Sequence, residues 1–532
     1  MPRRSPSPSS GPKQPRKRVL IVGAGAAGMS CAEQLSQHPK TYDVTLVDAQ
    51  DYCGGQAFSI PIDEKRHGSS WMNQGVQGGS YIYHHTFRMF KKQGFEAQPV
   101  DLQVSFGKDD KFWTNAFPTD LVAKHQKEIG RFKWAMRTIR WTEAVWALIP
   151  IKITLKIWGF SDEFMNYMIY PSLALFLGTG NATPDLPTVM MERLYTSPTY
   201  GMWYPVDDHS LSSNLPPMVV FPEESKFYTQ WQHDMESRGV TIRLNTEIVS
   251  IPERSKDRVR VQLRGRRPQP DHHNPVGADQ DLPITEETYD EIVLCVLADT
   301  AKRLLGKTAT FMEKQVLGMT KWSDDITVTH TDLDYMKKWY TMDMPENVPK
   351  TLSGRDEQDR IDRGRKDFNP MYLIKQVPDD PKLLEMCFDC SNFQYQLKDA
   401  KKPVEDHIFQ TIFLNKKDKE TWTIDEIKED KIIRKDWWHQ LEHRWTHYAF
   451  VVPFMSFLNG KKRTHFAAAW TLVNAHELAV ISGMAAAYAL GAAYPEELMD
   501  DAFAVLCFRL YLLLDHRKWY SKKENSKRLN KQ

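Results

Sequence analysis

The sequence predicts an α/β fold that begins with a parallel strand–helix–strand unit, and three observations within residues 18–48 support this prediction. The first is a short apolar run, Val19–Val22, which is typical of a strand buried on both faces. The second is a set of three glycines in G-x-G-x-x-G spacing directly after it: Gly23, Gly25 and Gly28. The third is an apolar segment, Val44–Val47, that ends in Asp48, 20 residues after Gly28. This combination predicts a Rossmann-type dinucleotide-binding domain.

The glycines of this turn each have a physical role in binding a pyrophosphate. Gly23 allows a tight turn, Gly25 lets the backbone approach the phosphates, and Gly28 lets the following helix pack against the strand. Three small residues lie between them: Ala24, Ala26 and Ala27. The helix predicted over residues 29–36 directs its N-terminus and its unpaired N–H groups at the phosphates. The alternative is a glycine-rich turn in an unrelated α/β domain.

The identity of the dinucleotide depends on the residues after the turn. We expect the Asp48 carboxylate to bind ribose hydroxyls, which favours a free 2′-hydroxyl over a 2′-phosphate but does not separate NAD from FAD. Gly54 and Gly55 follow the second strand and precede Gln56. A glycine pair at this place resembles an extension in FAD-binding proteins of the glutathione-reductase and amine-oxidase types. By this resemblance the cofactor is FAD.

The length and the charge distribution of the chain limit how the rest of it can be organised. With 532 residues, the chain is too long for one simple core, and two domains are expected. Residues 1–18 and 517–532 each carry a net charge of +6, which leaves −10 for the body of the chain. An acidic body with basic tails argues against a nucleic-acid-binding face. We expect the tails to be solvated, with a weak peripheral membrane contact as the alternative.

The sequence shows no sign of secretion, membrane insertion or metal binding. Its first residues lack the apolar core of a secretory signal, and no uncharged apolar stretch reaches the ~18 residues of a membrane span. The six cysteines are scattered, and the C-x-x-C at Cys387 and Cys390 lacks the second pair or His cluster of a metal site. Because nothing demands disulfides, a cytoplasmic location is expected.

Downstream segments predict further elements in order. Residues 68–81 are small and flexible, and either contact a flat ring or form a surface loop. Residues 95–220 are rich in Trp, Leu and Ile and predict the first part of a mostly helical cap. A helix of small residues is predicted over 477–490. Short strands are predicted at residues 104–106, 112–113, 240–251 and 291–296, and polar insertions at 265–284 and 345–369.

Over most of residues 18–495 these features resemble the flavin-containing amine oxidoreductase superfamily. Besides the glycine-rich turn, the resemblance rests on Met72–Gly75, on Arg243–Ile248 and on Glu477 with Ser482 and Gly483. It implies a Rossmann-type FAD-binding domain and a discontinuous α+β substrate (cap) domain. The implied boundaries are a disordered leader at 1–17, the FAD-binding domain at 18–85, 221–300 and 441–495, the cap at 86–220 and 301–440, and a C-terminal helix and basic tail at 496–532.

The resemblance also implies site residues outside the glycine-rich turn. Further FAD contacts are expected at Gln56, Asn73, Gly75, the backbone of Ile248, Glu477 and Ser482. His447 occupies the place of a His that precedes the last FAD segment, and is either a general base or a structural residue. Lys375 lies on an apolar strand and is a candidate to orient a water molecule near the flavin N5.

Three functional hypotheses follow. By resemblance, FAD removes a hydride from a C–N or C–C bond of a small hydrophobic substrate, molecular oxygen reoxidises it, and the protein acts in specialised metabolism. The second hypothesis is an FAD-dependent isomerase or desaturase of a fatty-acyl or terpenoid chain. The third is a non-catalytic, FAD-stabilised interaction protein.

Overall fold

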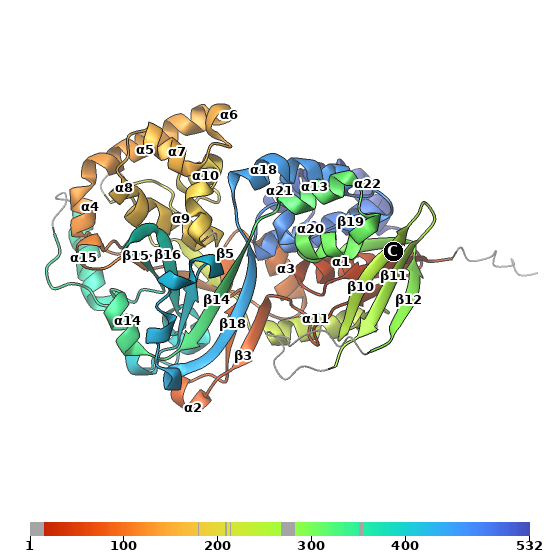
Figure 1. Cartoon of the computed structure of the whole chain (residues 1–532), viewed down its shortest axis with the longest axis horizontal. Helices are drawn as coiled ribbons and strands as arrows, with labels where there is room; N and C mark the ends of the chain where they lie inside the picture. The colour runs from red at the N-terminus through yellow and green to blue at the C-terminus, as the bar shows by residue number, and fades with distance from the viewer. Residues whose placement is uncertain (1–14, 179, 208–209, 213, 268–281, 350–354) are drawn as a thin grey trace, which may run out of the picture.

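The computed structural model describes residues 15–178, 180–207, 210–212, 214–267, 282–349 and 355–532. Most of the predicted leader and most of the polar insertion at 265–284 lie outside the described residues. Figure 1 shows two lobes, with the long strands β14 (Trp322–His330) and β18 (Ile432–Leu441) running between them.

One lobe, on the right in Figure 1, is built on a sheet of five strands in the order β19-β13-β1-β2-β9. These strands are β19 (Thr464–Phe466), β13 (Glu291–Leu294), β1 (Lys17–Val22), β2 (Tyr42–Val47) and β9 (Thr241–Arg243). All neighbouring pairs in it are parallel. The predicted α/β fold class and its Rossmann-type unit are therefore confirmed.

The apolar run of β1 is buried on both faces, as a central parallel strand requires. Val19 and Ile21 pack into a core with helices α1 (Ala26–Ser36) and α20 (His476–Leu490). Leu20 and Val22 pack into a second core on the other face. That core includes residues of β10 (Thr246–Arg254), β11 (Val259–Gly265), β12 (Ile284–Tyr289), α12 (Ala298–Leu305) and α13 (Phe311–Met319).

Helices α1 and α20 approach each other very closely. A Cβ atom at Gly483 would collide with the Ala27 carbonyl and the Ser30 hydroxyl. The Ser30 hydroxyl donates a hydrogen bond of 2.9 Å to the Val480 carbonyl. Every residue of α1 is buried. Small residues on both helices therefore set the distance between the first and the last helix of this lobe's core.

The other lobe contains a sheet of six strands in the order β18-β14-β17-β16-β15-β7. The strands not yet placed are β17 (Phe409–Phe413), β16 (Asp380–Asp389), β15 (Tyr372–Val377) and β7 (Val104–Phe106). Helices of the cap are α4 (Asp120–Lys124), α5 (Gln126–Trp141), α6 (Glu143–Trp146), α7 (Ile151–Ile157), α8 (Asp162–Phe164), α9 (Tyr170–Leu177) and α10 (Thr188–Thr196). The strand predicted at 112–113 is wrong, because Trp113 forms only an isolated bridge to Phe106.

Residues 68–81 are not one flexible loop. They form β4 (Trp71–Gly75), which pairs with β3 (Ala57–Pro61), and β5 (Gly78–Ser80), which pairs with β8 (Pro217–Val220). β8 also pairs with β6 (Gln98–Asp101). Hydrogen bonds between strands therefore fix the backbone of residues 68–81. The small side chains of this segment did not indicate that pairing.

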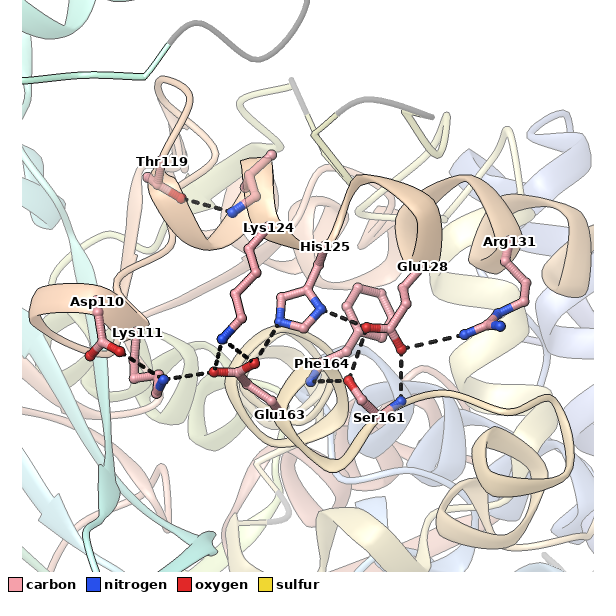
Figure 2. A network of polar contacts seen from close by, with 11 residues as sticks. Asp110, Lys111, Thr119, Lys124, His125, Glu128, Arg131, Ser161, Glu163 and Phe164 are labelled. Carbon is pink, nitrogen blue, oxygen red and sulfur yellow. Dashed lines mark hydrogen bonds and ion pairs between the residues drawn. The ribbon is translucent and has the colours of Figure 1, made fainter.

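A network of ionic contacts ties the cap helices together (Figure 2). His125 lies between the carboxylates of Glu128 and Glu163, at 2.6 and 3.1 Å. The ammonium groups of Lys111 and Lys124 also contact Glu163, at 2.6 and 2.7 Å. Burial opposes ionisation of Glu163, but the hydrogen bonds from Lys111 and Lys124 lower its pKa to about 2. The network joins α4, α5 and α8 within the cap.

The C-terminal residues form α21 (Ala502–His516) and α22 (Lys522–Leu529). Within the described part of the chain, no helix is both long enough and apolar enough to span a bilayer. The described residues also hold no cluster suited to a metal ion, and all six cysteines are free thiols.

The close approach of α1 and α20 predicts that a larger residue at Gly483 destabilises the fold. Gly483→Ala is expected to lower the free energy of unfolding by about 1–3 kcal/mol, because the added methyl group forces the helices apart. Gly130→Ala on α5 is the control, since nothing lies within 4 Å of its Cβ position. It is expected to raise stability by up to ~1 kcal/mol through helix propensity. Denaturant titration measures both; equal stability of the Gly483→Ala variant and the parent protein would contradict the prediction.

Candidate functional site

The glycine-rich turn opens onto a cavity of about 430 Å³, which we call the dinucleotide cavity. One wall contains Gly23, Gly25, Ala26, Ala27 and Asp48, with Gly54, Gly55 and Gln56. Opposite segments from β18 and α20 complete it. Eight predicted cofactor residues of the N-terminal unit thus line one space, whereas Ala24 and Gly28 are not among its lining residues.

The three glycines of the turn occupy different environments. At Gly23 φ is +104° and a Cβ would collide with the Cys295 carbonyl, while a Cβ at Gly28 would collide with the Gly23 carbonyl. At Gly25 the nearest atoms to a Cβ position are 4.0 Å away, on Gly54 and Gly55. The free space at Gly25 lies at the N-terminus of α1, which has no side-chain cap. Open amides and open space together fit a pyrophosphate.

Asp48 is held at the end of β2 by backbone amides. Its carboxylate accepts hydrogen bonds from the N–H groups of Ala24 (2.6 Å) and Gln50 (2.8 Å). Burial raises the pKa of Asp48, and these amides oppose that rise. The remaining lone pairs of a carboxylate at the cavity wall fit the ribose hydroxyls of a dinucleotide.

The N-terminus of α20 contributes Ala475, His476 and Ala479 to the lining of the dinucleotide cavity. The imidazole of His476 is fixed at both nitrogens: Nε2 lies 2.7 Å from the Tyr228 hydroxyl and Nδ1 lies 3.0 Å from Thr86 Oγ1. Burial lowers the pKa of His476 to about 4, so it is neutral near pH 7. The sequence reasoning missed His476, although it directly precedes the predicted Glu477.

A third wall is aromatic and includes one cationic group. The tryptophans in this wall are Trp322, Trp437, Trp438 and Trp470. His439 stacks on Trp322, with ring centroids 5.0 Å apart. The ion pair with Asp299, followed by that with Asp324, raises the pKa of His439 to about 9. A flat, electron-rich wall of this kind suits an aromatic ligand.

A second, larger cavity of about 770 Å³ adjoins the first, and we call it the apolar cavity. Val76, Asn474 and Ala475 line both cavities. Its other lining side chains are mainly apolar and come from both lobes, including Leu175, Phe176, Met218, Phe388, Leu478 and Leu510. The Glu477 carboxylate is also in this wall.

Several residues implied by the resemblance lie behind these walls. Asn73 is fully buried and donates to the carbonyls of Phe221 and Pro222, at 3.1 and 2.9 Å. Ile248 belongs to the core on the other face of the sheet. The Ser482 hydroxyl donates a hydrogen bond of 2.7 Å to the Ala479 carbonyl of its own helix.

Two further implied residues lie at the apolar cavity. A Cβ at Gly75 would lie 2.9 Å from the Trp438 ring, so the glycine admits this tryptophan. Glu477 accepts from the His85 and Thr86 amides, at 3.0 and 2.8 Å, and thereby joins α20 to helix α3 (His84–Lys92).

Neither predicted catalytic residue lines the dinucleotide cavity or the apolar cavity. His447 on α18 (Trp445–Phe450) is buried, and burial lowers its pKa to about 4. Lys375 contacts the Glu385 carboxylate at 3.1 Å and lies 3.8 Å from the centre of the Trp339 ring. Both ionic partners of this pair are buried away from the cavities. The structure therefore gives Lys375 a position in a separate polar cluster of the six-stranded lobe.

The cation at the cavity predicts a pH dependence. A raised pKa means that His439 stabilises the fold fully below pH 6.5, and that this contribution is lost as pH rises towards about 9. His439→Gln should therefore lose stability relative to the parent near pH 6, and the gap should close by pH ~9.5. Unfolding by denaturant at several pH values measures this gap. His233→Gln, at an exposed site, is the control; a gap for His439→Gln that is constant with pH contradicts the prediction.

Comparisons with known proteins agree with this geometry. Residues 21–92 match a family model described as an NAD(P)-binding Rossmann-like domain. No curated protein gives a sequence match. Among solved structures, the chain is similar to a CLA-producing fatty acid isomerase from P. acnes, with 14% identity, a TM-score of 0.54, and coverage of 89% of this chain and 98% of that one.

Two oxidases are similar over the same extent. Putrescine oxidase bound to putrescine has 11% identity and a TM-score of 0.57, covering 89% of this chain and 99% of that one. Cyclohexylamine oxidase from Brevibacterium oxydans has 12% identity and a TM-score of 0.52, covering 90% and 99%. At such low sequence identity, these similarities establish a shared fold and nothing about substrate. The chain shares the overall fold of these isomerase and oxidase structures.

Proposed function

We propose that this protein is an FAD-dependent oxidoreductase that removes a hydride from a C–N or C–C bond of a small hydrophobic substrate. The observation that carries the proposal is the junction of two cavities with different chemistry. A cavity suited to a dinucleotide meets an apolar cavity at Val76, Asn474 and Ala475. Molecular oxygen is the proposed electron acceptor, and specialised metabolism the proposed setting.

The residues of the dinucleotide cavity fit FAD. The α1 amides and the space at Gly25 would hold the pyrophosphate, and Asp48 a ribose. When bound, FAD supplies a ring system that accepts a hydride from a substrate carbon. Gln56 and the tryptophan wall would border the remainder of the cofactor. His476 is neutral and engaged at both nitrogens, by Tyr228 and Thr86, so it would border the cofactor through its ring and add no charge to the cavity.

The apolar cavity determines the proposed substrate class. Its lining favours an apolar chain or ring. Burial opposes ionisation of Glu477, but His85 and the amides of His85 and Thr86 lower the pKa of its carboxyl group. An anionic carboxylate in this wall favours a neutral or cationic group, such as an amine, over a substrate carboxylate.

A second candidate is an FAD-dependent isomerase or desaturase of a fatty-acyl or terpenoid chain. It is supported by the mainly apolar lining of the larger cavity and by the similarity to a fatty acid isomerase structure. The two candidates differ in their products, since an oxidase consumes oxygen and forms peroxide, whereas an isomerase leaves the redox state of its substrate unchanged.

The cofactor proposal is tested by the visible spectrum of the purified protein. We expect a bound flavin with absorption near ~450 nm, and loss of that flavin in Gly25→Val, whose side chain would fill the space for the pyrophosphate. Gly265→Val is the control, because nothing lies within 4 Å of its Cβ position. A protein that stays colourless with excess FAD, and whose melting temperature does not move, would overturn the proposal.

The substrate proposal is tested by offering octylamine, benzylamine and linoleic acid to the flavin-loaded protein. Anaerobic bleaching by an amine, with peroxide release in air, supports the oxidase; isomerised linoleic acid without peroxide supports the second candidate. A flavin that no probe bleaches, without product, favours a non-catalytic protein.

Narrowing the apolar cavity should separate substrate binding from cofactor binding. Val473 lines the apolar cavity and lies outside the dinucleotide cavity. Val473→Trp is expected to lower kcat/KM for the active probe at least tenfold while the flavin spectrum is retained, because the indole occupies substrate space. Val473→Ile is the matched control with a small effect. Unchanged kcat/KM in the Trp variant would place the substrate elsewhere.

A further inference from the structure

A second group of charged residues lies at the edge of the parallel sheet opposite the dinucleotide cavity. Because parallel strands run in one direction, the start of β1 at Lys17, the start of β13 at Glu291 and the residue before β19, Arg463, meet at the amino edge. These residues line an open cavity of about 900 Å³, which we call the basic cavity. The C-terminal ends of α20 and α21 complete it.

The basic cavity carries an excess of positive charge. Six cationic side chains line it: Lys17, Arg254, Lys256, Lys462, Arg463 and Lys518. Arg254 is neutralised by Glu313 at 2.7 Å. The single carboxylate among the lining residues, Glu291, contacts Lys17 at 2.8 Å and Arg463 at 3.4 Å. The ammonium groups of Lys256 and Lys462 have no ion-pair partner among the described residues.

Two buried imidazoles in the same wall have unused nitrogens. His465 and His516 are 6% and 9% exposed, and their ring centroids lie 5.9 Å apart. Within the described part of the chain, neither His465 Nδ1 nor His516 Nε2 has a hydrogen-bond partner. Burial, followed by the charges of Lys518 and Lys17, lowers the pKa of His465 to about 3. Neutral imidazoles are stable in this positive surrounding, and each can donate from its unpaired nitrogen in one of its two tautomers.

The end of α20 engages one of these cations, Lys518. The Leu490 carbonyl at the end of α20 accepts from the Tyr42 hydroxyl at 2.9 Å, and the Ala489 carbonyl accepts from Lys518 at 2.5 Å. Lys462 and Arg463 adopt φ values of +47° and +58°, a backbone conformation that costs energy in non-glycine residues. This strained turn holds two cationic residues at the cavity.

We propose that the basic cavity binds a compact, multiply charged phosphate anion, held by Lys256 and Lys462 and by N–H donors from His465 and His516. Anions of this class offer several acceptor oxygens at one centre, which matches converging cationic and imidazole donors. The site is separate from the dinucleotide cavity, and the proposal does not depend on the function proposed above.

The test is calorimetric titration of the full chain with inorganic pyrophosphate, in the presence of saturating FAD. FAD at saturation would occupy the dinucleotide cavity, so that pyrophosphate can bind only elsewhere. The same titration without FAD would show any additional binding of pyrophosphate to the dinucleotide cavity. We expect one pyrophosphate per chain. The exposed double variant Lys256→Ala/Lys462→Ala should raise the Kd at least tenfold, the change that 1.4 kcal/mol produces.

Two further variants make the result specific. Lys337→Ala/Lys417→Ala removes the same charge from exposed lysines remote from the cavity, and should leave the Kd unchanged. His465→Gln tests the buried donor, and its melting temperature shows whether it folds. Equal Kd values for both lysine pairs, or no binding by the folded parent protein, would overturn the proposal.

Discussion

The close contact between α1 and α20 is the constraint on which the site depends. Gly483 lies against the Ala27 carbonyl, and Ser30 bonds to the Val480 carbonyl. Two helices that touch at this distance bring their N-termini to one space, so the α1 amides and the α20 residues Ala475 and His476 face the same cavity. Dense packing makes that geometry rigid, because a single added methyl group has no room to fit.

The two adjoining cavities divide the chemistry between them. The first offers amides, the Asp48 carboxylate and aromatic rings, which suit a charged and flat cofactor. The second offers mainly apolar side chains, and its buried carboxylate, Glu477, is fully engaged by His85 and Thr86. Glu477, which joins α3 to α20, thus also lies in the wall of the space proposed for the substrate. The same residue therefore stabilises the fold and would influence which substrates bind.

Local spacing was enough to predict the α/β fold and the glycine-rich turn, because a strand, a turn and a helix are contiguous in sequence. It was not enough for His476 or Trp438, which reach the cavity through long-range packing. Lys375 shows what the sequence of a strand cannot predict. It pairs in register with Glu385 on β16, and an apolar flanking sequence does not say which face of the sheet it takes. The proposed roles of His447 and Lys375 came from family position, and the structure places both outside the cavities.

The walls of the dinucleotide cavity come from chain segments between Gly23 and Ala479. A nascent chain on the ribosome therefore has no complete cradle until α20 emerges. Until then, the small-residue face of α1 is apolar surface without its partner helix. For the FAD proposed above, a shortage would thus act on newly made chains as a folding problem first, and as loss of the proposed activity second.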